Sequence, residues 1–128
     1  MKILGIGVDI INNKRIRKSI TNKAFIKRIF TSKEILASKP NKNKTNYFAK
    51  RFAAKESFVK ALGTGFRNNL NFRDIEILNN KLGKPYFSDN KKIKKIIFDT
   101  FKVKSSHLFL SISDEKDYSI AFTIIQKR

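Results

Sequence analysis

Residues 46–65, NYFAKRFAAKESFVKALGTG, predict the central helix of this protein, running from about Asn46 to Leu62. Four apolar residues fall within one narrow sector at about 100° per residue, as on a helix face that packs on a core: Phe48, Phe52, Val59 and Leu62. The neighbouring flank holds Ala49, Ala53, Glu56 and Lys60. Gly63-Thr64-Gly65 ends the helix, because glycine readily adopts the left-handed conformation of a C-cap.

Residues 2–11, KILGIGVDII, predict a largely buried strand that carries Leu4, Ile6, Val8 and Ile10 on one face. Gly5 and Gly7 permit another backbone to approach closely. Asp9 is then an acid at the end of an apolar strand.

A basic amphipathic stretch runs from Asn12 to Phe30 and is predicted to break near Thr21-Asn22. Thr31 and Glu34 have the spacing of a capping box, which predicts a short helix from Ser32 to Ser38.

Two hairpins and one further helix are predicted after the central helix. The first hairpin has a strand from Phe72 to Leu78, a turn at residues 79–81 and a short strand entered through residues 83–86. Asp89-Asn90 caps a helix that carries Ile93, Ile96, Ile97 and Phe101. The second hairpin pairs His107–Ser113 with Tyr118–Ile125, which both alternate. The fold class is therefore α+β, a single domain over residues 1–128 with an antiparallel sheet covered by helices.

Composition bounds the function. The chain has 128 residues, with 29 Lys plus Arg against 10 Asp plus Glu, and a formal net charge of +19. Such a charge favours a polyanionic partner: nucleic acid, an anionic membrane surface, a phosphorylated small molecule or an acidic protein. The absence of cysteine excludes disulfides and thiol chemistry. The N-terminal apolar run is interrupted by Asp9 and does not resemble a signal peptide or a membrane span, so we expect a cytoplasmic protein.

Asp9 and Glu56 are the acids most in need of an explanation, because each lies among apolar or small residues where a carboxylate needs compensation. Two carboxylates without His or Cys nearby favour a hard ion such as Mg²⁺, and Lys60, one turn after Glu56, would meet the phosphates of a substrate. The alternative is structural: Glu56 and Lys60 form a surface ion pair, and Asp9 caps the next helix.

Gly63-Thr64-Gly65 lies near that flank and offers backbone N–H groups to a phosphate, although most such triplets only end a helix. His107, the only histidine, is predicted to be structural.

Four segments together resemble the holo-acyl-carrier-protein synthases, which are small bacterial 4′-phosphopantetheinyl transferases: GIGVDIINNKRI (5–16), RFAAKESFVKALGTGFR (51–67), ILNNKLGKPY (77–86) and SISDEKDYSIAF (111–122). The resemblance implies that coenzyme A is the donor, that a serine of an acyl carrier protein is the acceptor in fatty-acid synthesis, and that 3′,5′-ADP is released. It also implies Mg²⁺ as the cofactor.

The resemblance assigns roles to individual residues. Asp9 and Glu56 match the metal ligands, and Glu56, directly or through a water that it orients, is the candidate for accepting the serine proton. Lys60 matches a lysine that contacts the coenzyme A phosphates, and Arg51 an arginine at the 3′-phosphate end. The remaining matches line the nucleotide pocket: Gly63, Gly65, and Lys84 and Pro85 of the Gly83-Lys84-Pro85 turn. Asp114, where many relatives carry histidine, is left out of the site.

The resemblance further implies a homotrimer with active sites between subunits. On a helical wheel Arg51 lies far round from Glu56, so it would serve the site of a neighbouring subunit. The acidic carrier protein is expected to dock transiently on the basic first helix, where Arg15 matches a carrier-contacting arginine and Arg17 and Lys18 extend the patch.

Two other hypotheses compete with this one. A small nucleic-acid-binding protein would explain the charge and the 12 Phe, but it leaves Asp9 and Glu56 without a role. A catalytically silent scaffold would not bind coenzyme A with Mg²⁺. The family resemblance predicts neither a nucleic-acid nor a membrane partner.

Overall fold

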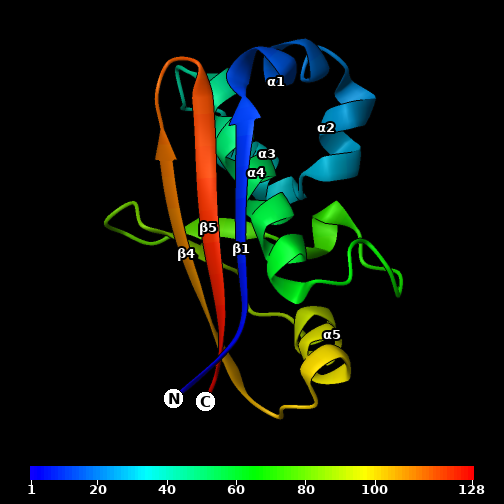
Figure 1. The fold of residues 1–128 in the computed structure, drawn as a ribbon. Coiled ribbons are helices and arrows are strands. Elements are labelled where there is room, and N and C mark those ends of the chain that lie inside the picture. The colour runs from blue at the N-terminus through cyan, green and yellow to red at the C-terminus, as the bar shows by residue number, and fades with distance from the viewer.

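A computed structural model describes all 128 residues, and its centre is a three-stranded antiparallel sheet in the order β1-β5-β4 (Figure 1). The strands are β1 (Lys2–Asn12), β4 (Ser106–Asp114) and β5 (Tyr118–Lys127). The predicted C-terminal hairpin is confirmed, since β4 pairs with β5. The N-terminal strand β1 adds to the other edge of β5.

The helices all lie on one face of this sheet or beyond its ends (Figure 1). They are α1 (Asn13–Ser19), α2 (Lys23–Ile29), α3 (Ser32–Ser38), α4 (Lys44–Leu62) and α5 (Lys91–Phe101). The break at Thr21-Asn22, the capping box of α3, the Asn90 cap of α5 and the left-handed Gly63 that ends α4 are confirmed. None of these helices has the combined length and hydropathy of a membrane-spanning segment.

The first hairpin is shorter than predicted. Its strands are β2 (Ile77–Asn79) and β3 (Pro85–Phe87), and the start of the predicted strand is instead a 3-10 turn, η1 (Phe72–Asp74). Asp74 explains the difference, because its carboxylate accepts the backbone N–H of Asn71 at 2.8 Å and pairs with Lys92 at 2.6 Å. A capped turn leaves this backbone unavailable to a strand partner.

The apolar face of β1 is exposed, contrary to the sequence prediction. Ile6, Val8 and Ile10 have 57%, 49% and 62% of their surface accessible, because they point away from the helices. Gly5 and Gly7 lie on the opposite face of β1, against α4. A Cβ on Gly5 would overlap the carbonyl oxygen of Ala61, and a Cβ on Gly7 would overlap the carbonyl oxygen of Ser57. The missing side chains therefore let α4 lie directly on β1.

Two buried interactions fix α4 in its place. The Ser57 hydroxyl lies 2.6 Å from the Thr123 hydroxyl of β5, which joins the helix to the sheet. On another side of α4, Lys55 Nζ donates to Glu34 Oε1 of α3 at 2.7 Å, and both side chains are fully buried. Burial lowers the pKa of Lys55, and the Glu34 carboxylate opposes that shift.

Candidate active site

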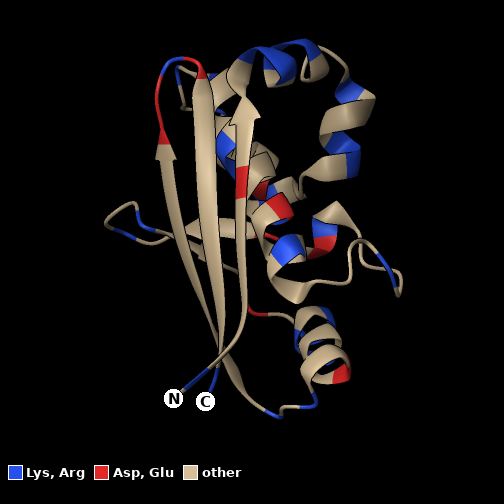
Figure 2. Cartoon of the chain, in the orientation of Figure 1, with Lys and Arg blue, Asp and Glu red and all other residues tan.

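Asp9, Glu56 and Lys60 come together where β1 crosses α4, and we call these three residues the carboxylate site. Asp9 follows Gly7 by two residues, so its side chain lies on the face of β1 that meets α4. Its Oδ1 atom accepts from Lys60 Nζ at 3.0 Å. In Figure 2, one acidic position lies on β1 beside acidic positions of the neighbouring helices.

Glu56 lies close enough to Asp9 for the two charges to interact. Burial of Glu56 is the first cause that raises the pKa of its carboxyl, and the negative charge of Asp9 raises it further. Lys60 opposes both effects. Two acids that repel each other in this way are suited to share a cation.

Both parts of the structural alternative are wrong. Lys60 pairs with Asp9 on the neighbouring strand, and no ion pair joins it to Glu56. The cap of α1 is Asn12, whose side chain accepts the backbone N–H of Lys14 at 2.9 Å, so Asp9 caps nothing.

The two glycines after α4 extend the carboxylate site along the chain. Gly63 and Gly65 both have positive φ, 79° and 70°, and a Cβ at either would meet nothing within 4 Å. The Gly63 N–H donates to the Val59 carbonyl oxygen at 3.1 Å, whereas the N–H groups of Thr64 and Gly65 form no backbone hydrogen bond and remain available to a ligand beyond Lys60.

Arg51 belongs to a second group on a different side of α4. Its guanidinium lies 3.8 Å from the Tyr47 ring centroid and donates to Asn79 Oδ1. Asn79 in turn donates to the Gly83 carbonyl oxygen at 2.8 Å, which ties Arg51 to the Gly83-Lys84-Pro85 turn. We call Arg51, Asn79 and this turn the Arg51 cluster.

The carboxylate site and the Arg51 cluster do not meet within one chain. Five residues separate Arg51 from Glu56, which is about 140° around a helix. Figure 1 shows the β2–β3 hairpin extending beyond the β4 edge of the sheet, whereas Asp9 lies on β1 at the other edge. Arg51 is only 5% exposed, and its Nε atom has no hydrogen-bond partner.

The basic residues predicted to bind the carrier, and Asp114, lie outside both of these groups. Arg15, Arg17 and Lys18 are exposed on α1, and none of them forms an ion pair. Asp114 accepts from Asn46 Nδ2 at 2.9 Å, which gives it a structural role. Sequence reasoning missed the buried Lys55–Glu34 pair, although Lys55 directly precedes Glu56 and the capping box had identified Glu34.

Comparisons with known proteins show the family of the chain. The sequence model of the 4′-phosphopantetheinyl transferase superfamily matches residues 5–123. The holo-[acyl-carrier-protein] synthase of Pelagibacter ubique is 61% identical over 128 residues, which cover 100% of both chains.

Solved structures agree in fold over nearly the whole chain. The holo-[acyl-carrier-protein] synthase of Neisseria meningitidis superimposes with a TM-score of 0.87 at 42% identity, covering 98% of this chain and 100% of that one. The synthase of Bacillus anthracis, in complex with CoA (3′,5′-ADP), gives a TM-score of 0.81 at 34% identity and covers 98% of each chain. The chain therefore belongs to the holo-[acyl-carrier-protein] synthases, the phosphopantetheinyl transferase enzymes of this superfamily.

Proposed function

We propose that this chain transfers the 4′-phosphopantetheine group of coenzyme A to a serine hydroxyl of an apo acyl carrier protein, in fatty-acid biosynthesis. The observation that carries the proposal is the carboxylate site, where two interacting acids and a half-exposed lysine share one junction. The coenzyme A complex of the Bacillus anthracis relative supports the donor.

Asp9 and Glu56 would hold Mg²⁺. Their oxygen atoms suit a hard cation, and a positive ion between them would relieve the repulsion that raises the pKa of Glu56. When bound, such an ion stabilises negative charge on phosphoryl oxygens. Lys60 has 53% of its side chain exposed and would donate to the same phosphates.

In the transfer step the serine oxygen forms a bond to the β-phosphorus of coenzyme A. The bond from that phosphorus to the bridging oxygen breaks, and adenosine 3′,5′-bisphosphate leaves with the bridging oxygen. Glu56, directly or through a water that it orients, takes the serine proton.

A homotrimer would complete the site. The outer face of the sheet carries an uncovered apolar patch with 39–62% of each side chain's surface accessible: Ile6, Val8, Ile10, Phe109, Ile120 and Phe122. An exposed patch of this kind is typical of a protein interface. A neighbouring subunit would supply its own Arg51 cluster to the carboxylate site, with Arg51 at the 3′-phosphate end and Lys84 and Pro85 lining the nucleotide pocket.

The acidic carrier protein would dock on α1 through Arg15, Arg17 and Lys18. The three side chains are exposed on α1, which directly follows β1, and they lie six to nine residues after Asp9. Complementary charge would speed the encounter.

The experiment that tests the function measures the intact mass of an apo acyl carrier protein after incubation with this protein, coenzyme A and Mg²⁺. We expect the mass to increase by one phosphopantetheine, and EDTA to abolish the increase. An unchanged carrier mass with folded proteins and Mg²⁺ would overturn the proposal, and binding to random-sequence DNA would then be measured.

A further inference from the structure

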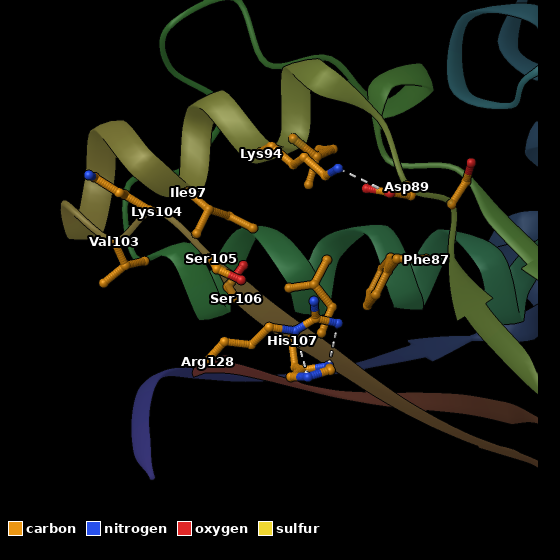
Figure 3. Close-up of a pocket in the computed structure, with 13 residues that line it drawn as sticks. Phe87, Asp89, Lys94, Ile97, Val103, Lys104, Ser105, Ser106, His107 and Arg128 are labelled. Atoms are coloured by element: carbon orange, nitrogen blue, oxygen red, sulfur yellow. Dashed lines mark hydrogen bonds and ion pairs between the residues drawn. The ribbon is translucent and has the colours of Figure 1, made fainter.

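A cavity of about 420 Å³ lies between α5 and the first residues of β4, apart from the carboxylate site (Figure 3). Its volume is within the range of small-ligand pockets. Asp9 pairs with Ala121 of β5, whereas Ser106 at the cavity pairs with Lys127. Six residues of strand separate these levels, which is about 20 Å.

The walls of the cavity combine apolar side chains with hydroxyl groups. Phe87, Ile97 and Leu108 supply apolar surface from β3, α5 and β4. Ser105 and Ser106 supply two hydroxyls, neither of which forms a side-chain hydrogen bond within the chain. An apolar wall with a few convergent polar groups is the usual composition of a small-molecule site.

The Arg128 guanidinium places a positive charge at this cavity and pairs with no Asp or Glu side chain. Its backbone N–H donates to the Ser105 carbonyl oxygen at 3.1 Å, which fixes the residue beside the end of β4. Its Nε atom donates to His107 Nε2 at 2.6 Å, and Figure 3 shows the guanidinium lying over the imidazole ring. His107, the only histidine, thus orients the arginine.

The other charges at the cavity leave it positive. Lys94 pairs with Asp89 at 3.1 Å at the far side of the cavity, and both side chains are largely exposed. Lys104 forms no ion pair, and Asp89 is the only acid among the lining residues. With Lys94 paired to Asp89, the side chains of Lys104 and Arg128 are the two cationic groups of the cavity without an ion pair.

We infer that this cavity binds a small organic anion, with a carboxylate or phosphate group against Arg128 and the serine hydroxyls and an apolar body against Phe87, Ile97 and Leu108. A guanidinium and two hydroxyls match the acceptor oxygens of such a group. This second site does not depend on the transfer reaction, because it shares no residue with the carboxylate site or the Arg51 cluster.

Titration of the ¹⁵N-labelled protein with four probes tests the assignment: phenyl phosphate, benzoate, benzyl alcohol and inorganic phosphate. We expect phenyl phosphate or benzoate to shift the amide signals of Ser105, Ser106 and Leu108 in a saturable way. Benzyl alcohol, which has no charge, and inorganic phosphate, which has no apolar body, should each bind at least tenfold more weakly. The stronger of the two aromatic anions identifies the acidic group.

The variant Arg128→Gln should weaken the binding of that anion at least tenfold, because it removes a charged donor. Lys127→Gln is the matched control, since it removes the same charge from the adjacent exposed residue outside the cavity and should change binding less than twofold. Equal weakening by both variants, or no saturable shift at the three cavity amides, would overturn the inference.

Discussion

Lys60 Nζ lies 3.0 Å from Oδ1 of Asp9 on the neighbouring strand, although Glu56 stands one helical turn before it on the same helix. The lysine therefore joins α4 to β1 at the carboxylate site. Because Glu56 forms no ion pair and no side-chain hydrogen bond, its replacement removes a chemical group from the site without breaking a contact that holds the fold together.

The Glu56→Gln variant should lose transfer activity by a factor of about 100 or more, because the side chain can neither accept a proton nor offer a charged oxygen to a cation. Its thermal unfolding midpoint should stay close to that of the parent protein. Glu115→Gln is the control, since this exposed acid lies on the β4–β5 turn and should retain full activity. Near-normal turnover of Glu56→Gln in the intact-mass assay would contradict the role.

The pH dependence of Glu56 follows from the direction in which its pKa is shifted. Because burial and Asp9 both raise its pKa, the carboxyl stays protonated to a higher pH than an ordinary glutamate. Removing the Asp9 charge with Asp9→Asn should lower the pKa of Glu56 toward its usual value. Carboxyl ¹³C titration of both proteins without added metal measures the change. A Glu56 pKa that does not fall in Asp9→Asn would show that the two acids do not interact.

Gly7→Ala should destabilise the protein by about 3 kcal/mol, because the new methyl group would overlap the Ser57 carbonyl oxygen and push α4 from β1. Gly63→Ala is the matched control. The new Cβ would contact no other atom, so the only loss of stability comes from an alanine held in the left-handed conformation at φ 79°, which costs about 1 kcal/mol. Urea unfolding measures the free energy of unfolding of both variants. Equal losses would show that the close approach of α4 to β1 is not the reason for a glycine at position 7.

Local signals predicted most of the fold correctly. The capping box of α3 and the Asn90 cap of α5 act through residues three apart, so the sequence shows them directly. The carboxylate site was also predictable, because acids among apolar residues demand a partner. The exposure of the apolar face of β1 was not predictable, since the alternation of apolar residues along a strand identifies an apolar face but not what covers it. The Lys55–Glu34 pair joins residues 21 apart, beyond any local pattern.

The apolar sheet face predicts the outcome of a charge substitution. Val8 pairs with Phe122 across β1 and β5, and both are exposed in the single chain. Val8→Lys should therefore reduce the mass in light scattering to that of one chain, 14.9 kDa, because a buried unpaired charge would oppose assembly. Leu36→Lys, on exposed α3, should leave the assembly intact. A parent protein that is active as a monomer would contradict the shared site.

The basic helix α1 should govern carrier recognition and not the chemical step. Arg15→Glu places a negative charge where the acidic carrier is expected, so KM for the carrier should rise about tenfold at low ionic strength while kcat stays unchanged. Added salt should reduce the difference in KM between Arg15→Glu and the parent protein, because exposed charges are screened. Lys91→Glu, an equal charge change on exposed α5, is the control and should leave KM unaltered. If both variants raised KM equally, net charge and not α1 would attract the carrier.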